Sequence, residues 1–566
     1  MSDPVPPNPN RPDPDLESVA VTAPSEAMGR TVGGGMSWMV VSTVLTRLAT
    51  FLAQILLGLW LLPGDFALYA TATTIAGFLM VCRDMATGHI LVQQGAAAYE
   101  RTRGAAFWLA VAYNVAVAGL TSVVAYPLAV GVYHNEALAP MLIVMAWALP
   151  LGAVGNVLYA KLRLYMRFKA FGVQMALSGF LRQVSMVVLA KLGFGPMSFA
   201  WPILVCTLFD LVSLVIMSRE APWMYPPQLD QWKGLARRAL WLMVNSLANF
   251  AMDFGPFLVL PPILIATLRA ADPDSDFNKA AYDITGWYFF AYQITAQIGV
   301  MIAFNAAIVL VPALQRLHGE PDRQRDAALR SLRTLMLAGS IASLGLACVM
   351  EPLEHLLWNG KFAPSVAAVL VFGMFYPWRI TFGLCTSILM AQGAFRRLAI
   401  LSAFECLGLM AAAAAAGVWS PTTTGIAWWT GGWVLFSRLV ATWYVFHKMG
   451  GGWARTLGAV FPAWGVALAA FAVALLADAR LGVRTHLLGS EWLGRLVAAQ
   501  AGEPHRDLWV SRIADLARIL ITGSVCVATF GVLARVLLAD DLRDMLRVAP
   551  HRLRGPLVKL LRLPHD

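Results

Sequence analysis

Long apolar runs separated by short polar breaks occupy most of the chain between residues 36 and 538. A run of about 20 apolar residues is long enough to cross a bilayer as an α-helix. The pattern predicts an all-α, polytopic membrane protein with about 14 transmembrane helices. These spans are expected at residues 36–61, 66–92, 105–132, 138–160, 170–191, 197–218, 239–268, 282–312, 334–351, 365–392, 398–419, 424–446, 457–478 and 513–538.

The distribution of lysine and arginine between the spans predicts the orientation. With the N-terminus inside, the short inner loops hold 19 Lys and Arg residues, and the outer loops hold only Lys191, Arg269, Lys279 and Lys361. Positive charge accumulates on the cytoplasmic side of membrane proteins. We therefore expect a multi-pass protein of the bacterial inner membrane with both termini in the cytoplasm.

The polar breaks also suggest a division of the chain. The break at 219–238 separates six spans from eight, which predicts two six-helix bundles followed by two additional helices. A short internal echo, GDFALY at 64–69 and TGWY at 285–288, marks the second helix of each bundle. The predicted parts are a disordered cytoplasmic tail (1–35), an N-lobe (36–218), a linker (219–238), a C-lobe (239–446), the last two spans (457–538) with an outer loop (479–512), and a basic tail (539–566).

Composition narrows the class of protein. The 566 residues are 58% hydrophobic and 13% charged, with a mean hydropathy of +0.64. Soluble domains carry about 25% charged residues, and no loop is long enough for a soluble catalytic domain. The six cysteines lie in apolar runs and form no C-x-x-C pair, so we expect neither a disulfide nor a metal site. The basic tail is either amphipathic and bound to anionic membrane lipids or a mobile basic tail.

Nine ionisable residues lie inside the predicted spans, and five of them are arginines. An arginine at the bilayer centre costs on the order of 2.5–3.5 kcal/mol on insertion scales. These residues therefore indicate a polar pathway for an anionic substrate. The arginines are Arg47, Arg83, Arg182, Arg379 and Arg438, and the acids are Asp84, Asp210, Asp253 and Glu405.

The first span carries one polar stripe centred on an arginine. Thr43, Arg47, Thr50 and Gln54 fall on one helical face. Such a face lines a wet cavity or supports a structural ion pair. The first interpretation makes all four candidate substrate-binding residues.

Two later spans carry further polar faces. Asn245, Asn249 and Asp253 share a face of the seventh span, which suits a coupling cation or proton, interhelical hydrogen bonds, or an arginine partner for Asp253. Gln293 and Gln297 share a face of the eighth span, which suits glycan contacts or helix packing.

Depth along the spans suggests two structural ion pairs. Arg83 and Asp210 lie at similar depth in the N-lobe, and Glu405 and Arg438 lie at similar depth on consecutive C-lobe spans. If both pairs form, Arg47, Arg182 and Arg379 are left as uncommitted cations near mid-depth. These three are the candidates for binding a substrate anion.

Several segments resemble the Wzx-type polysaccharide flippases of the multidrug/oligosaccharidyl-lipid/polysaccharide flippase superfamily. The residues that carry the resemblance lie in order along residues 36–450. They are LLPGDFALY at 61–69, RDMATGHILVQQ at 83–94, YFFAY at 288–292, VPALQRL at 311–317 and LMAQG at 389–393.

The resemblance implies two six-helix bundles that work by alternating access. It also implies transport of a polyprenyl-diphosphate-linked oligosaccharide to the outer leaflet for polysaccharide assembly. Arg47 occupies a place comparable to a functional arginine of the lipid II branch. The alternatives are a cation-coupled multidrug antiporter of the same superfamily and a membrane-embedded glycan polymerase or ligase.

The proposed transport also implies an oligomeric state, a form of energy coupling and a set of partners. We expect a monomer that is not an enzyme and has no cofactor, with coupling to the membrane potential, Na⁺ or H⁺. Its partners would be the lipid-linked glycan, membrane lipids and the polysaccharide polymerase machinery, and no nucleic acid.

Overall fold

The computed structural model describes residues 45–83 apart from 47, 96–164, 168–236, 247, 250–316, 320–392, 394–450, 452–482 and 506–539. Throughout these residues the regular secondary structure is helical, which confirms the all-α prediction. The predicted tails at 1–35 and 540–566 and most of the loop at 479–512 lie outside the described residues.

The first half of the chain forms a bundle that we call the N-lobe. Its helices are Leu48–Trp60, α3 (Pro63–Arg83), α5 (Ala96–Gly131), α6 (Leu138–Leu164), α7 (Phe168–Lys191) and α8 (Met197–Ser218). The connection to the next lobe contains two short 3₁₀ segments, η1 (Pro222–Met224) and η2 (Leu229–Gln231).

The second half forms the C-lobe and two further helices packed beside it. The C-lobe helices are α10 (Pro256–Ala271), α11 (Phe277–Arg316), α12 (Pro321–Trp358), α13 (Ala363–Phe375), α14 (Pro377–Ala391), α15 (Phe395–Trp419) and α16 (Thr423–Lys448). The last two are α17 (Trp453–Leu481) and α20 (Arg506–Leu537).

Every predicted span overlaps at least one described helix, although the helix ends differ from the apolar limits. Among the described residues, nine helices are long and apolar enough to cross a membrane, or ten if α13 and α14 form one bent span. The total of fourteen therefore stays a prediction. Helix α12 extends well beyond 334–351, and α20 begins at Arg506 rather than 513. Apolarity predicts the part inside the bilayer, whereas capping and packing decide where a helix ends.

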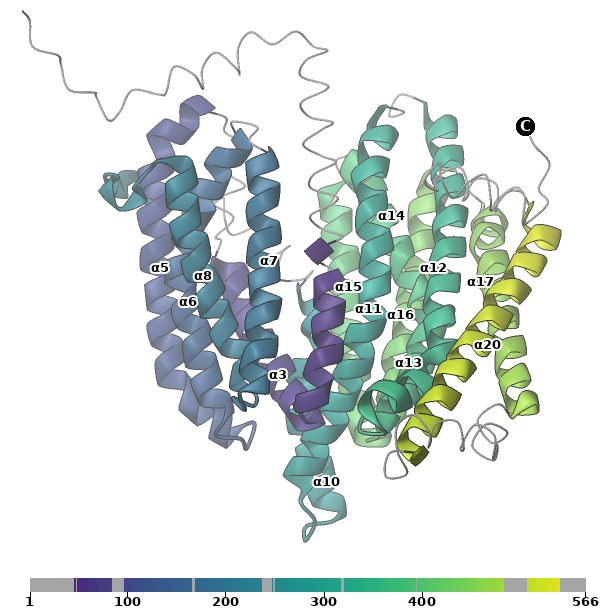
Figure 1. Ribbon diagram of the computed structural model, residues 1–566. Helices are drawn as coiled ribbons and strands as arrows, with labels where there is room; N and C mark the ends of the chain where they lie inside the picture. Colours follow the sequence, from purple (N-terminus) through teal and green to yellow (C-terminus); the bar gives the residue numbers. More distant parts are fainter. Residues whose placement is uncertain are drawn as a thin grey trace, which may run out of the picture.

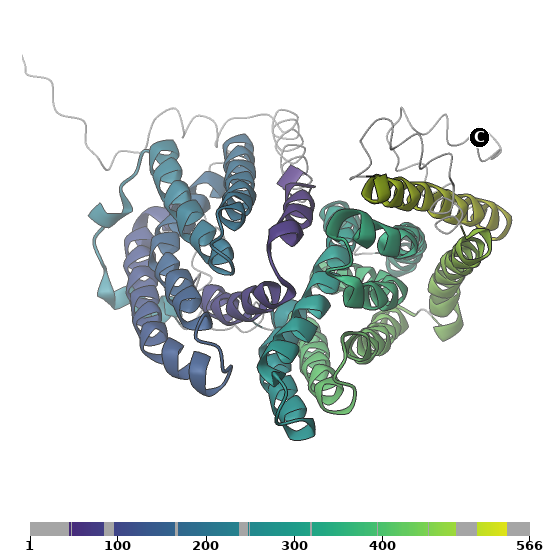
Figure 2. The same ribbon diagram turned by 60° about the horizontal axis from the view of Figure 1, so that its bottom comes forward.

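The two lobes lie side by side and meet through α3 (Figures 1 and 2). Helices α5, α6, α7 and α8 pack on one another, and α10–α16 form the second bundle. Helix α3 contacts α6 on one side and α11 and α10 on the other. Because α3 touches both bundles, its position couples the two lobes.

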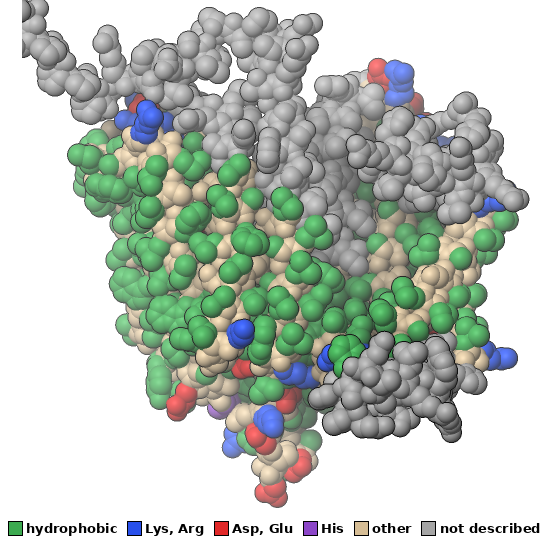
Figure 3. All heavy atoms as spheres, in the orientation of Figure 1, with side chains coloured by type: hydrophobic (Ala, Val, Ile, Leu, Met, Phe, Trp, Pro, Cys, Tyr) green, Lys and Arg blue, Asp and Glu red, His purple; other side chains and the backbone are tan. Residues whose placement is uncertain are grey.

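The exterior has the polarity expected of a protein that spans a membrane. On the face shown in Figure 3, hydrophobic side chains cover the middle, and charged side chains gather toward the top and bottom. Large apolar side chains such as Val123, Ile216 and Leu407 are exposed. Large apolar surfaces of this kind are covered by a partner, here lipid.

An arginine ties the last two helices to the C-lobe. Arg518 of α20 donates from Nε to both carboxylate oxygens of Asp478 on α17, at 2.8 and 2.9 Å. Its Nη2 also donates to Glu351 of α12, at 2.9 Å. A bidentate arginine–carboxylate contact is directional, so this network fixes how α17 and α20 pack on α12.

Candidate functional site

Two charged residues of the C-lobe lie beside prolines at the starts of helices. Asp253 lies in the helical turn before Gly255, whose φ of −51° and ψ of −42° carry the chain as one continuous helix into α10 at Pro256. Arg379 lies two residues after Pro377, where α14 starts at a 42° bend from α13. Broken helices are the usual places for substrate and ion sites in transporters.

Asp253 and Arg379 form an ion pair beside the bend between α13 and α14. Arg379 Nη2 donates to Asp253 Oδ1, and Nη1 lies 3.4 Å from the hydroxyl of Tyr292. The rings of Tyr376 and Tyr292 lie on the guanidinium, with centroids 5.3 and 5.7 Å from Cζ. Aromatic faces attract a guanidinium, so the tyrosines hold Arg379 in place independently of the carboxylate.

This pair corrects the expectation that Arg379 is an uncommitted cation. The depth argument had assigned acids to Arg83 and Arg438 only and had left Asp253 with several roles. The structure selects one of them, since Asp253 is the partner of an arginine. The reason is the packing of the seventh and tenth predicted spans, which are not consecutive in the chain.

A second ion pair lies deeper in the C-lobe. Arg438 Nη2 donates to Glu405 Oε1, which is the pair expected from the sequence. The two side chains are only 2% and 3% exposed, and Cζ of Arg438 lies 4.0 Å from the centroid of Phe382. A buried pair of this kind is locked in place, because neither charge can be left alone without a large penalty.

Of the candidate substrate-binding arginines in the N-lobe, Arg182 is the one that the structure describes. It lies on α7. Its Nη2 lies 3.5 Å from the hydroxyl of Tyr69 on α3, and its buried Nε makes no hydrogen bond among the described residues. Within the described part of the chain, Arg182 forms no ion pair with an acid. Among the described residues, it is a positive charge that has no acidic counter-ion within ion-pair distance.

Polar side chains extend the N-lobe site toward the first helix. Gln183 Nε2 donates to the Thr50 hydroxyl at 3.1 Å, and Thr50 donates to the carbonyl of Thr46 at 2.8 Å. Gln54 is buried at 8% exposure. Thr50 therefore contacts α7, the helix that carries Arg182.

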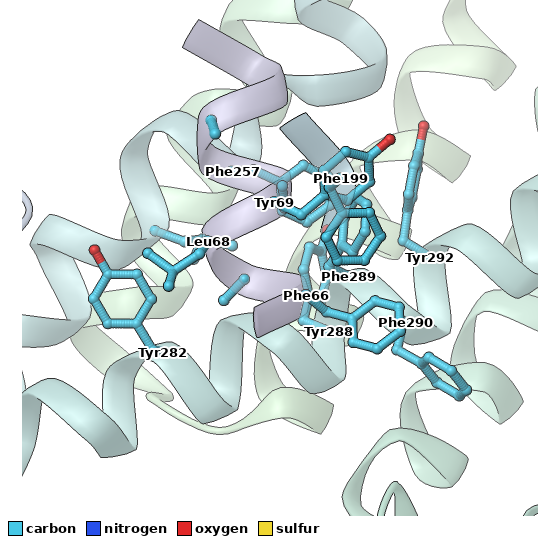
Figure 4. Close-up of a cluster of buried hydrophobic side chains, with 14 of the residues drawn as sticks. Phe66, Leu68, Tyr69, Phe199, Phe257, Tyr282, Tyr288, Phe289, Phe290 and Tyr292 are labelled. Atoms are coloured by element: carbon cyan, nitrogen blue, oxygen red, sulfur yellow. The ribbon is translucent and has the colours of Figure 1, made fainter. Parts of the chain in front are cut away.

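Aromatic rings form a continuous layer (Figure 4) from Tyr69, which Arg182 approaches, to Tyr292, which lies on Arg379. Tyr69 lies 5.8 Å from Phe289, Phe289 lies 5.0 Å from Phe257, and Phe257 lies 5.5 Å from Tyr292. Tyr69 also stacks on Phe199 of α8 at 4.0 Å. The layer joins helices α3, α8, α10 and α11, and it carries an arginine at each end.

The sequence reasoning missed the roles of these tyrosines. Tyr69 and Tyr288 stand only within motifs, Tyr292 counts only among the polar residues of the eighth span, and nothing in the sequence singles out Tyr376. One signal was present, since Tyr288 and Tyr292 are four residues apart and share a helical face. Tyr288 donates to Thr430 of α16 at 3.1 Å, whereas Tyr292 meets Arg379.

The remaining candidates lie partly outside the described residues. Arg47, Thr43, Asn245 and Asn249 are not described, nor are the side chains of Arg83 and Gln297. Asp210 accepts a hydrogen bond from Gln174 Nε2 at 2.9 Å, so its pairing with Arg83 stays a prediction. Gln293 is partly buried on α11. Among the described residues, no cluster of His, Cys, Asp or Glu is arranged to hold a metal ion.

Beyond the aromatic layer, hydrogen bonds join the lobes at the predicted outer end. Trp358 Nε1 donates to the carbonyl of Ile55 at 3.0 Å, and Lys361 Nζ donates to that of Gly58 at 3.1 Å. Tyr282 donates to the carbonyl of Tyr133 at 2.9 Å. The helix carbonyls at residues 55 and 58 belong to the N-lobe, so these contacts hold the two lobes together at this end.

Sequence comparisons show that the chain is similar to proteins of polysaccharide biosynthesis. Residues 56–265 match a family model described as "Polysaccharide biosynthesis protein". The chain is 27% identical over 335 residues to the "Succinoglycan biosynthesis transport protein ExoT" of Rhizobium meliloti (strain 1021). That alignment covers 59% of this chain and 64% of the relative, just under two thirds of its length.

Structural comparisons show the fold. A solved structure described as "Lipid II flippase MurJ, inward closed conformation" has a TM-score of 0.63 at 11% identity, covering 88% of this chain and 99% of the other. An inward-facing multidrug resistance transporter of the MATE family has a TM-score of 0.57 at 14% identity, covering 72% and 94%. The chain therefore has the fold of a polytopic membrane transporter.

Proposed function

We propose that the chain, which belongs to the family of polysaccharide biosynthesis transporters and lipid-linked flippases, moves a polyprenyl-diphosphate-linked oligosaccharide across the membrane. The proposed direction is from the inner to the outer leaflet of the bacterial inner membrane, with both termini in the cytoplasm. The product would enter the assembly of exopolysaccharide, capsule or O-antigen. The name of the relative from Rhizobium meliloti favours an exopolysaccharide.

One observation carries the proposal. Each lobe presents an arginine to the same aromatic layer, Arg182 from α7 and Arg379 from α14. Guanidinium groups bind phosphate oxygens through two parallel hydrogen bonds. A diphosphate carries enough oxygens to engage an arginine from each lobe, so the substrate's head group would bridge the two halves that move.

The rest of the substrate has chemically suitable surroundings. Hydroxyl and amide groups such as Thr50 and Gln183 can hydrogen-bond a glycan, and tyrosine faces can stack on sugar rings. The polyprenyl chain would remain in lipid, against the exposed apolar side chains of the lobes. Sugar, diphosphate and tail would then each meet groups of matching polarity.

The membrane potential is a sufficient driving force for this export. Moving one charge across 100 mV is worth about 2.3 kcal/mol, so two negative charges leaving an inside-negative cell gain roughly 4–5 kcal/mol. Coupling to Na⁺ or H⁺ would add to this term. We propose that the chain works without a cofactor, as a monomer, and passes its product to the polymerase machinery.

The test is transport by the purified chain in liposomes. A fluorescent lipid-linked oligosaccharide is incorporated, and a membrane-impermeant reagent reports the glycans that appear on the far side. Arg182→Ala should lower the rate at least about tenfold, since a lost charge-assisted hydrogen bond to phosphate is worth about 1.5–3 kcal/mol. Arg269→Ala, which removes an arginine at the outer end of α10, is the matched control and should transport normally.

Wild-type transport by Arg182→Ala would show that this arginine does not handle the anion. Export of a cationic drug against an ion gradient, without glycan transport, would favour the antiporter alternative. Lengthening of the glycan chain would favour the polymerase alternative. Normal thermal unfolding of each variant excludes a folding defect as the cause.

A further inference from the structure

The ion pairs formed by Arg379 and Arg438 have the same chemistry but opposite environments. The Asp253 side chain is 50% exposed and Arg379 is 18% exposed, whereas Glu405 and Arg438 are 3% and 2% exposed. Exposed ion pairs are weak because water competes for both charges. A buried pair cannot separate without leaving an uncompensated charge. Only the Asp253–Arg379 pair is therefore able to exchange partners.

The position of Arg379 calls for an anion beside it. Arg379 lies in the first turn of α14, where the helix dipole adds positive character to that of the guanidinium. A negative group nearby is favourable for both the guanidinium and the helix dipole. In the structure that group is Asp253, which lies in the helical turn before Gly255 and α10.

Arg379 has supports that do not depend on the carboxylate. Tyr292 and Tyr376 lie on its guanidinium, and Tyr292 also lies within 3.4 Å of Asp253 Oδ1. If Asp253 moved away, the tyrosines would keep the guanidinium in the same place. Arg379 and the two tyrosines therefore form a preorganised anion site, which the carboxylate of Asp253 occupies.

We propose that Asp253 is an exchangeable counter-ion that occupies this site in the empty protein and is displaced by a phosphate group of the substrate. This inference rests on the proposed function and deepens it. A monodentate carboxylate with one charge competes poorly against a diphosphate with at least two charges and several acceptor oxygens. After the lobes rearrange, the return of Asp253 to Arg379 releases the phosphate.

The proposal predicts the sign and size of a change in affinity. The apparent dissociation constant is the intrinsic one divided by the fraction of protein whose site is free. If the internal pair is formed about nine-tenths of the time, removing the carboxylate should tighten anion binding about tenfold. Because release would then slow, the same change should lower the transport rate.

The experiment measures binding of inorganic diphosphate to the purified full-length chain by calorimetry. Asp253→Asn should bind about tenfold more tightly than the wild type, and Asp253→Ser should do the same. The matched control is Glu351→Gln, another half-exposed acid paired with an arginine, whose affinity should not change. Arg379→Gln should weaken diphosphate binding. The double variant Asp253→Asn with Arg379→Gln should not show the tighter binding expected of Asp253→Asn alone.

Three results would overturn the proposal. They are unchanged or weaker binding by both Asp253 variants, equal tightening by Glu351→Gln, and a gain that survives in the double variant. The proposed function is tested separately by glycan transport. If the Asp253 variants bind diphosphate more tightly but the wild type transports no lipid-linked glycan, the counter-ion proposal stands and the proposed function is wrong. If the wild type transports the glycan but the Asp253 variants have unchanged diphosphate affinity, the proposed function stands and the counter-ion proposal is wrong.

Discussion

At the scale of single residues, exposure rather than residue type separates the roles of the arginines. Arg182 has no acidic partner among the described residues, Arg379 has a half-exposed one, and Arg438 has a buried one. The three guanidiniums are chemically identical. In the proposed function, their surroundings leave the first for an anion, make the second exchangeable and make the third structural.

The buried pair leads to a prediction about stability. Glu405→Gln should destabilise the protein by about 3–5 kcal/mol, because Arg438 would be left charged and buried. Replacing Glu405 and Arg438 together with leucine should recover most of this loss. Glu351→Gln, which leaves Arg518 its second acid, should cost less than about 1 kcal/mol. Thermal unfolding in detergent measures all three, and equal losses for the two glutamines would contradict the distinction.

At the scale of elements, the two helices that carry the internal echo cross at their glycines. A Cβ added to Gly286 of α11 would lie 1.9 Å from the carbonyl oxygen of Pro63 at the start of α3. A Cβ on Gly64 would lie 3.5 Å from Asp283. The matching segments thus meet each other in space, and close backbone approach explains the glycine at 286.

The crossing can be tested with one methyl group. Gly286→Ala should push α3 away from α11, since a backbone oxygen has no rotamer by which to move aside. We expect transport to fall at least about tenfold while the protein still inserts. Gly345→Ala on α12 meets no atom within 4 Å and is the control. Normal transport by Gly286→Ala would mean that the crossing already separates in the working cycle.

At the scale of the whole molecule, the lobes are joined at the predicted outer end by groups that satisfy a helix terminus. The last carbonyls of a helix have no partner within it and carry partial negative charge. In the Leu48–Trp60 helix, Gly58 has one of these carbonyls and accepts from Lys361 of the opposite lobe, and the carbonyl of Ile55, one turn earlier, accepts from Trp358. Separation of the lobes must therefore break contacts that are favourable only when the outer end is shut.

Removing these contacts should shift the balance between the two states of the transporter. Lys361→Ala combined with Trp358→Phe should raise the population open to the outside by about tenfold if each hydrogen bond contributes about 0.5–1.5 kcal/mol. A cysteine introduced at Tyr69 should then react faster with an impermeant maleimide added outside. Lys279→Ala, at the same end on α11, is the control. Unchanged reactivity would show that the hydrogen bonds of Trp358 and Lys361 do not keep this end shut.

The apolar pattern by itself determined the helices, because burying a backbone in lipid requires about 20 apolar residues per span. It also determined the Glu405–Arg438 pair, since these residues lie at equal depth on consecutive antiparallel helices, which a short loop makes neighbours. Only the tertiary structure decided that Asp253 meets Arg379, 126 residues away, and that rings from four helices join Arg182 to that pair. Those contacts follow from the packing of non-consecutive helices, which hydrophobicity and depth do not specify.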